Sequence, residues 1–312
     1  MQTLEGSPVL VHAGPFANIA HGCSSIVADA VALKLVGPDG YVITEAGFGS
    51  DIGMEKFMNI KCRTSGLVPN AVVLVTTVRS MKMHGGGPPV VPGSPLKSEY
   101  TQENLELVKK GFANLQKHIS NGLKYGVPVI VAINKFKEDT DAELNLIKQM
   151  SEANGAFRSV ICTHFANGGP GALDLADAVI EVCDKPSTFK FLYEPSMSLM
   201  QKISTIAKEM YGAGEVKCSP LVQQRLKEYE AHGYGSFPVC MAKTSLSLTG
   251  DQSVKGAPTG FALDVNNVTL SAGAGFVVVF CGEITSMPGL GTRPNFYDMD
   301  YDSVSDEIQG LF

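Results

Sequence analysis

The segment TTVRSMKMHGGGPP, residues 76 to 89, has the residue types of an anion-binding site. It follows the apolar run 71–75, so we expect a buried strand to continue into a cationic, glycine-rich loop. Consecutive glycines let the backbone approach a ligand and aim several N–H groups at one oxyanion or phosphate, whose charge an arginine or lysine could neutralise. The candidates are Arg79, Lys82, His84, Gly85, Gly86 and Gly87. The alternative is a flexible surface turn with solvated basic neighbours.

Polar or glycine-rich residues follow three predicted strands, at residues 41–44, 71–77 and 128–133. In open α/β sheets, ligands bind beyond the carboxyl ends of the strands. Three such endings in successive strands predict one shared crevice. Asn134 and Lys135, directly after the third strand, would lie along it.

The flanking elements predict an α/β protein. Helical patterns at 98–125, 139–153 and 171–182 alternate with these strands and with a short strand at 160–162. This alternation predicts parallel pairing with right-handed crossovers.

The pattern changes after about residue 195. Two helices follow in sequence, at 198–211 and 220–232, and then a turn-rich tail whose clearest strand lies in 271–282. A domain boundary near residues 145–160 and one near 195 both fit this pattern.

Phe165, in THFANGG, follows a predicted strand and precedes a glycine pair. An aromatic ring at the rim of a crevice can stack on a flat heterocycle. The alternative is plain core packing.

Two familiar kinds of site are not supported by the sequence. AINKF (132–136) resembles the base-reading NKxD motif of GTPases, but Lys137 replaces the aspartate, and no G-x-x-x-x-G-K-[ST] phosphate loop occurs. The six histidines form no HExxH or comparable pair, so we expect no metal site.

The composition indicates which classes of binding partner the protein has. The net charge of −6 and the pI near 5.6 argue against a nucleic-acid or anionic-membrane surface. No stretch approaches the roughly 20 apolar residues of a membrane span, and residues 1–16 lack the pattern of a signal peptide. Seven scattered cysteines without CxxC are typical of free thiols in a reducing compartment, so we expect a cytoplasmic protein, with a mitochondrial location as the alternative.

Several longer strings together resemble one family. HAGPFANIAHGCSS, VITEAGFGSDIGMEKFMNIKCR, LVTTVRSMKMHGGGP, GVPVIVAINKFKEDTDAEL, FPVCMAKTSLSL and LSAGAGFVVVFCGEITSMPGL are similar to formate–tetrahydrofolate ligase, also called 10-formyltetrahydrofolate synthetase. VTTVRSMKMHGG resembles the signature V-A-T-[IV]-R-A-L-K-x-[HN]-G-G, from which it departs at Thr76, Ser80 and Met81. The similarity is greatest to the ligase domain of eukaryotic one-carbon folate proteins.

The resemblance implies an activity. The family phosphorylates formate with MgATP and passes the formyl group from formyl phosphate to N10 of tetrahydrofolate, with a monovalent cation as a further cofactor. It implies that the HGGGP loop holds the phosphate of formyl phosphate and that Phe165 stacks on a flat ring. Arg79, Lys82 and Gly85 to Gly87 would then be catalytic. Ligand-binding roles would fall to Phe165, Asn134, His84, Pro288, Gly289 and Leu290, where Gly291 replaces the proline of the family's PGLP.

The resemblance also implies an organisation. Residues 1–24 would end an inserted domain, 25–145 would be the latter part of the nucleotide-binding α/β domain, and 146–312 would be a folate-side α/β domain. The parallel sheet would be a partial P-loop-NTPase-like sheet without its P-loop, because the family carries that loop in a segment that this sequence lacks.

Three hypotheses follow. The first is a ligase polypeptide that is incomplete as a lone chain and acts as a homo-oligomer or with a full-length relative. The second is a non-catalytic folate-binding or oligomer-forming module. The third is a chain without an independent fold, because cutting a domain exposes a strand edge and an apolar face.

Overall fold

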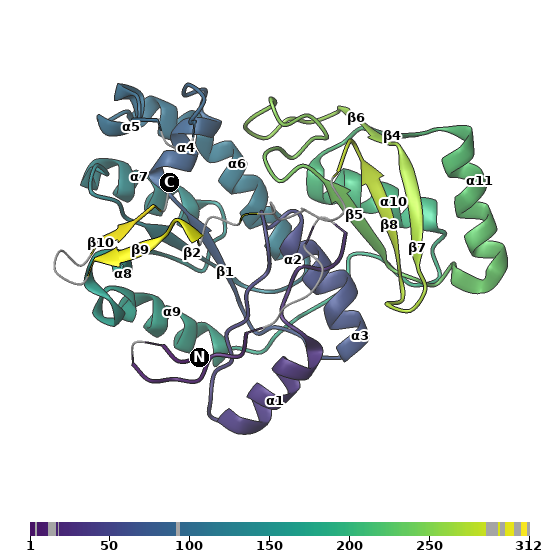
Figure 1. Cartoon of the computed structure of the whole chain (residues 1–312), viewed down its shortest axis with the longest axis horizontal. Coiled ribbons are helices and arrows are strands. Elements are labelled where there is room, and N and C mark those ends of the chain that lie inside the picture. Colours follow the sequence, from purple (N-terminus) through teal and green to yellow (C-terminus); the bar gives the residue numbers. More distant parts are fainter. Residues whose placement is uncertain are drawn as a thin grey trace.

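The first sheet contains the strands that the sequence predicts most clearly. β1 (Val72–Thr76), β2 (Val129–Asn134) and β3 (Arg158–Cys162) are parallel, in the order β1-β2-β3. The computed structural model describes residues 1–3, 5–11, 17, 19–91, 94–284, 293, 297–302 and 307–310. Within them this sheet and its helices form one lobe, and a second lobe lies beside it (Figure 1).

Helices cover both faces of the first sheet, as parallel sheets require. Val129, Val131 and Ile133 pack with α4, α6 and α7, while Ile130 and Ala132 pack with α9. The helices of this lobe are α4 (Val78–His84), α5 (Ser98–Thr101), α6 (Leu105–Lys124), α7 (Asp141–Ala153), α8 (His164–Asn167), the 3₁₀ turn η2 (Gly169–Ala172) and α9 (Leu173–Cys183). The predicted α/β class is confirmed.

The single helix predicted at 98–125 is two helices. Asn104 caps α6 by accepting a hydrogen bond from the backbone N–H of Leu107 at 3.0 Å, so a second helix begins there. After this cap, the buried residues Val108, Phe112 and Ile119 recur at helical spacing. They form the side of α6 that packs on the sheet.

The second lobe is built on two further sheets. β4 (Glu215–Cys218) pairs in parallel with β6 (Ala262–Val265), and β8 (Phe276–Cys281) lies between parallel β5 (Val239–Lys243) and antiparallel β7 (Asn267–Ser271). Its helices are α10 (Leu199–Ile206) and α11 (Pro220–Tyr229), which continue as the π-helical segments η3 (Ala207–Tyr211) and η4 (Glu230–Tyr234).

A domain boundary after residue 145 would divide α7, whose 13 residues run from Asp141 to Ala153. β3 and α9 also pack on the first sheet, so this lobe extends to Cys183. A boundary near 195, between α9 and α10, would divide no element, and the choice between the two boundaries stays a prediction. The assignment of residues 1–24 to an inserted domain stays a prediction.

Helix α6 makes a polar contact with the second lobe. Asn114 donates to the carbonyl oxygen of Gly256 at 2.8 Å, and Asn121 donates to that of Met210 at 2.8 Å. Lys117 and Lys124 both donate to the carbonyl oxygen of Glu209, at 2.7 and 2.8 Å. Side chains of one lobe therefore bind backbone carbonyls of the other.

The N-terminal part differs from its prediction. Residues 41–44 form no strand, and in that segment Tyr41 is 45% and Ile43 86% exposed, so no neighbouring strand buries their side chains. α1 (Ile26–Val36) precedes this segment, and a helix continuous through α2 (Gly53–Lys56), the π-helical η1 (Phe57–Cys62) and α3 (Arg63–Ser65) follows it.

The only strand pair near the C-terminus that the structure describes is the antiparallel hairpin of β9 (Asp300–Asp302) and β10 (Glu307–Gln309). In Figure 1 it lies on the side of the first lobe. The described helices include none with the length and apolar character needed to cross a bilayer.

Candidate functional site

The carboxyl ends of the first sheet converge at one edge. Thr76 of β1 is in register with Ile133, and Asn134, the last residue of β2, is in register with Cys162 of β3. The convergence predicted for the second and third strand endings is therefore confirmed, and β3 joins them. The first predicted ending, residues 44–49, does not follow a strand.

Three side chains from these strand ends form a contact series. The guanidinium carbon of Arg79, in the first turn of α4, lies 5.2 Å from the centroid of the Phe136 ring, two residues beyond β2. The Phe136 ring contacts the ring of Phe165, in α8 after β3, with centroids 6.4 Å apart and planes inclined by 42°. We call Arg79, Phe136 and Phe165 the aromatic rim.

Phe165 has an open face. Its side chain is 87% exposed, although an aromatic ring normally gains by burial, so the core-packing alternative for this residue is wrong. Phe136 supports it from one side. A flat, partly apolar ring can bind against such a surface, and the arginine adds positive charge beside it.

Sequence reasoning missed Phe136. It lies in the AINKF string, two residues after Asn134, but the comparison with NKxD drew attention to the missing aspartate instead. A signal was available: Phe136 follows a buried strand, and Phe165 follows the adjacent strand in the same way.

The glycine run does not form the predicted anion site. β1 is followed by the helix α4, which Thr77 caps, and not by a loop. The N–H groups of Gly85, Gly86 and Gly87 donate to the carbonyls of Met81, Met83 and Lys82, at 2.8, 3.3 and 2.9 Å. These donors are satisfied, and they lie at the negative end of a helix dipole, which disfavours an anion.

Close packing accounts for the glycines instead. A β-carbon on Gly85 would collide with the carbonyl oxygen of Leu107, and one on Gly111 with that of Met81. Gly86 has φ +104°, which L side chains rarely adopt. The run therefore ends α4 and lets it pack directly on α6.

Lys82 is not placed to meet a ligand. Its side chain is fully buried and its ammonium lies 2.7 Å from Oε1 of Glu143, whose side chain is also fully buried. It also donates to the carbonyl oxygen of Gln102 at 2.8 Å. The predicted role in neutralising a bound anion is therefore wrong, because the charge is neutralised inside the protein.

His84 lies at the contact between the lobes. Its Nδ1 accepts a hydrogen bond from the N–H of Gly256 at 3.1 Å. Burial, together with the nearby His118 and Lys255, lowers the pKa of His84 to about 4. The imidazole is thus neutral near pH 7 and joins the lobes.

The remaining predicted ligand-binding residues are Asn134, Pro288, Gly289 and Leu290. Asn134 lies at the carboxyl end of β2, along the edge that carries the aromatic rim. Pro288, Gly289 and Leu290 lie outside the described residues.

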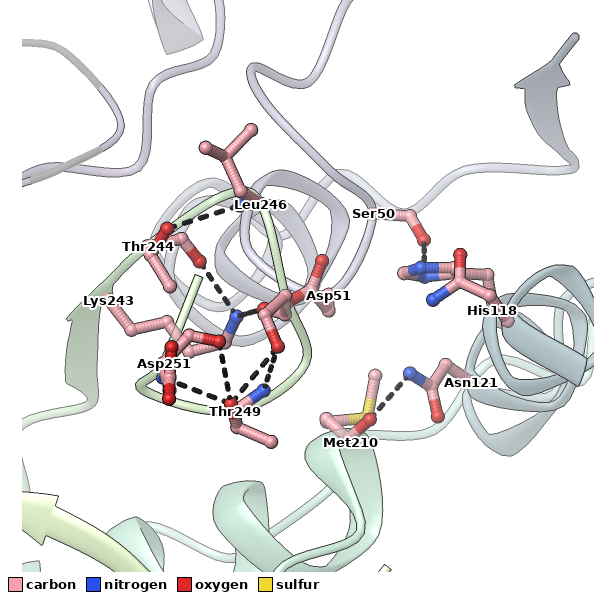
Figure 2. Close-up of polar contacts among 12 residues, drawn as sticks. Ser50, Asp51, His118, Asn121, Met210, Lys243, Thr244, Leu246, Thr249 and Asp251 are labelled. Carbon is pink, nitrogen blue, oxygen red and sulfur yellow. Dashed lines mark hydrogen bonds and ion pairs between the residues drawn. The ribbon is translucent and has the colours of Figure 1, made fainter. Parts of the chain in front are cut away.

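A second polar cluster, which sequence reasoning missed, lies where the segment before α2 contacts α6 and the end of β5. Figure 2 shows Ser50 pointing to His118, with its Oγ 2.7 Å from Nδ1, and Asn121 pointing to Met210. The ammonium of Lys243, at the end of β5, lies 2.7 Å from Oδ2 of Asp51. It also donates to the carbonyls of Thr244 and Ser247, which follow it in the chain, so the lysine already has three polar partners.

Glu55 lies one helical turn after Asp51 and is buried. Its Oε1 accepts from Asn59 at 2.9 Å, and Oε2 has no hydrogen-bond partner within the described part of the chain. Burial raises the pKa of this carboxyl to about 7, against the smaller lowering effects of Asn59 and Lys56. Near neutral pH it exchanges a proton, but its contacts show no path to the aromatic rim.

Metal ligands are not gathered anywhere in the described ranges: no group of three or more His, Cys, Asp or Glu side chains there could hold an ion.

Comparison with known proteins gives a family for these features. A family model described as formate–tetrahydrofolate ligase matches residues 1–312. The chain is 63% identical over all 312 residues to the cytoplasmic C-1-tetrahydrofolate synthase of Spodoptera frugiperda, 33% of which it covers. It is 56% identical to that of Homo sapiens, of which it covers 33%, and 55% identical to the mitochondrial monofunctional C1-tetrahydrofolate synthase of Mus musculus, of which it covers 32%.

The chain thus spans about a third of the length of these relatives. The matched region covers the whole of this chain. This chain belongs to the formate–tetrahydrofolate ligase family.

Proposed function

We propose that the chain carries the folate-holding part of a formate–tetrahydrofolate ligase, which formylates N10 of tetrahydrofolate through formyl phosphate at the expense of ATP. The observation that supports this most is the aromatic rim: Arg79, Phe136 and Phe165 follow the ends of three parallel strands, and Phe165 is 87% exposed. That face suits the flat pterin or aminobenzoyl ring of a folate.

Each rim residue has a distinct part in this proposal. Phe165 stacks on the folate ring with its open face, and Phe136 supports Phe165 from behind. Arg79 sits over the ring of Phe136 and supplies positive charge toward an acyl phosphate or a folate carboxylate. Asn134, at the end of β2, offers an amide to the same edge. The loop of Pro288, Gly289 and Leu290 stays in the proposal on family resemblance alone.

Phosphoryl transfer needs more than these residues provide. Mg²⁺ and a monovalent cation enter the proposal only through the family, and we assign no residue to either. When bound, Mg²⁺ would neutralise charge on the transferring phosphoryl group. The 312 residues contain no G-x-x-x-x-G-K-[ST] phosphate loop, and the N–H groups of Gly85–Gly87 donate to carbonyl oxygens of α4.

We therefore propose that the three-stranded sheet is part of a larger P-loop-NTPase-like sheet and that the lone chain does not turn over. The alternative of a non-catalytic module is not favoured by the family match. The names of the similar C-1-tetrahydrofolate synthases support a cytoplasmic location, with a mitochondrial one as the alternative. Small molecules, and neither nucleic acid nor membrane, are the proposed substrates. Association with a second copy or with a longer relative is proposed as well.

A tryptophan reporter tests folate binding directly. The chain has no tryptophan, so Phe165→Trp introduces a single one at the rim while keeping an aromatic face. Tetrahydrofolate should quench its emission saturably, and Phe136→Ala in the same background should weaken binding by about tenfold, the effect of about 1.4 kcal/mol of aromatic packing. The matched control is Leu221→Trp, on the exposed surface of α11, where no saturable quenching is expected. Equal quenching at both positions would refute the assignment.

The catalytic part is tested separately by measuring 10-formyltetrahydrofolate formed from formate, MgATP and tetrahydrofolate. We expect folate binding without turnover by the lone chain. Robust turnover would show that a nucleotide site exists in these residues and would overturn the proposed incompleteness, while leaving the folate site in place.

A further inference from the structure

Among the described strands, β3 is an outer strand of the first sheet, and part of its backbone points away from β2. The carbonyl oxygen of Cys162 accepts from the N–H of Lys135 on the β2 side. Because successive residues of a strand alternate in direction, Ile161 points its N–H and C=O outward. Ser159 points outward as well, but its N–H already donates to Oε1 of Glu152 at 3.1 Å. Ile161 therefore offers both of its backbone groups for pairing with a further strand.

A groove of about 420 Å³ follows this edge, with α7 as the wall on one face of the sheet and α9 as the wall on the other. Its lining includes Ser159, whose side chain is buried and whose Oγ has no hydrogen-bond partner in the part of the chain that the structure describes. Since a buried hydroxyl normally has a partner, the groove indicates a polar occupant. Together with the open groups of Ile161, it fits an extended polypeptide, which binds a sheet edge through its backbone.

The two walls of the groove carry opposite charges that the protein does not neutralise itself. Lys148 lies on the α7 wall, and Asp174 and Asp177 lie on the α9 wall, in the first turns of that helix. All three side chains are exposed, and none of them forms an ion pair with another described residue. Arg158 also lines the groove, but Glu181 neutralises it, so only the other three charges can select an occupant.

The faces of β3 determine which charge each residue of a bound segment would meet. Ile161 packs with the apolar residues of α7, whereas Val160 and Cys162 pack with those of α9. In an antiparallel pair, directly opposed residues place their side chains on the same face of the sheet. A residue opposite Ile161 therefore points to the α7 wall with its free lysine, and the two residues beside it point to the α9 wall with its two aspartates.

We propose that the groove binds an extended segment of another protein in which one acidic residue lies between two basic residues. The acidic residue pairs antiparallel with Ile161, exchanges both backbone hydrogen bonds with it and brings its carboxylate to Lys148. The two basic side chains lie against Asp174 and Asp177. Because Glu152 occupies the N–H of Ser159, pairing is limited to Ile161, and the segment binds reversibly.

Synthetic peptides test the proposal on the full chain. The probe is the fluorescein-labelled peptide Thr-Val-Lys-Glu-Lys-Val-Thr, and the control peptide Thr-Val-Glu-Lys-Glu-Val-Thr carries the exchanged charges. Fluorescence anisotropy should show saturable binding of the probe and at least about tenfold weaker binding of the control, because like charges then meet on both walls. Absence of saturable binding at millimolar chain concentration would overturn the proposal, and so would equal affinity for the two peptides.

A modified probe separates strand pairing from simple attraction between charges. Methylation of the backbone nitrogen of its glutamate removes the N–H that the carbonyl oxygen of Ile161 would accept, while every charge is kept. Affinity should then fall by at least about tenfold, because the backbone bonds hold the segment. Unchanged affinity would mean that no strand is added at this edge.

Charge exchange in the chain identifies the two walls. The variant with Lys148→Glu, Asp174→Lys and Asp177→Lys should prefer the control peptide to the probe. Asp184→Lys is the matched control, since it alters an exposed acid at the other end of α9, outside the groove, and should leave the affinity for the probe unchanged. A triple variant that keeps the original preference would place the contact elsewhere. These measurements need no folate, so their failure would leave the proposed ligase function standing.

Discussion

Lys82 of α4 and Glu143 of α7 form an ion pair of 2.7 Å in which neither side chain is exposed. The same carboxylate accepts from the N–H of Asn104 at 2.7 Å and from that of Thr140 at 3.3 Å, so it also holds the starts of α6 and α7. A lysine that seemed available to a substrate thus fixes three helices beside the first sheet.

Breaking this pair from one side should destabilise the protein strongly. Lys82→Met leaves a buried carboxylate without its cation, and such losses amount to about 3–5 kcal/mol. Chemical denaturation followed by circular dichroism measures it. The control is Lys109→Met, which removes an exposed 3.3 Å pair with Glu106 and should change the free energy of unfolding by less than about 1 kcal/mol. Comparable effects of the two variants would contradict the assigned role.

The glycine run should respond to alanine in a position-dependent way. Gly85→Ala and Gly111→Ala place a methyl group against a backbone carbonyl of the neighbouring helix, so α4 and α6 must separate and stability should fall by about 1–3 kcal/mol or more. Gly86→Ala meets no neighbour and should cost only about 1–2 kcal/mol, for its positive φ.

Gly273→Ala, in an open turn without a positive φ, is the matched control and should be close to neutral. If Gly85→Ala were equally neutral and instead abolished ligand binding, the glycines would serve the ligand after all.

Arg79 should matter for binding more than for folding. Arg79→Gln removes the cation over Phe136, a contact of about 0.5–1 kcal/mol at a partly exposed site, so tetrahydrofolate should bind a few times more weakly. The Phe165→Trp reporter measures this loss, and the thermal midpoint should change little. Unaltered affinity would show that the arginine does not contribute to the rim's function.

Glu55 should make the protein less stable as pH rises. Its folded pKa of about 7 exceeds the ordinary 4.5, so the folded state holds the proton more tightly, and stability is lost between about pH 4.5 and 7. This difference corresponds to about 3 kcal/mol. Glu55→Gln should therefore raise the free energy of unfolding at pH 8 and leave it nearly unchanged at pH 4.5. A constant difference at every pH would contradict the raised pKa.

His84 should make the protein less stable as pH falls. Its folded pKa of about 4 lies below the ordinary 6.5, so the unfolded chain takes up the proton first, and stability is lost as pH falls from about 6.5 to 4. His84→Gln keeps an acceptor for the N–H of Gly256 and should flatten this acid limb. His232, exposed in η4, provides the control, since His232→Gln should leave the limb unchanged.

The first sheet could be predicted because its strands are locally distinctive. β1 and β2 are short runs rich in β-branched residues, and α7 begins with a capping box at Thr140 and Glu143. The alternation of such strands with helices predicts parallel pairing. Of the aromatic rim, Arg79 and Phe165 were among the predicted site residues and Phe136 was not. The prediction of a strand at 41–44 was wrong because the residues have strand propensity, but a strand also needs a neighbour.

The wrong parts of the site depend on partners distant in sequence. The sequence of the glycine run predicts a loop. In the structure the run ends α4, which packs closely on α6 at Gly111, and this contact between distant residues has no local sequence pattern. Lys82 reads as a free cation, but it pairs with Glu143, 61 positions away. Lys243, which sequence reasoning missed, pairs with Asp51, 192 positions away. No local pattern encodes such pairings.

The row of donors on α6 has a consequence for how this sequence can vary. Asn114, Lys117, Asn121 and Lys124 bind carbonyl oxygens, which every amino acid carries. The backbone contacts therefore do not depend on the side chains at Glu209, Met210 and Gly256, although Met210 is buried in the core, Gly256 has a positive φ and the carboxylate of Glu209 also pairs with Lys124. One helix alone thus specifies these hydrogen bonds by its side chains, and a replacement in the row removes a contact that no change on the opposite side can restore.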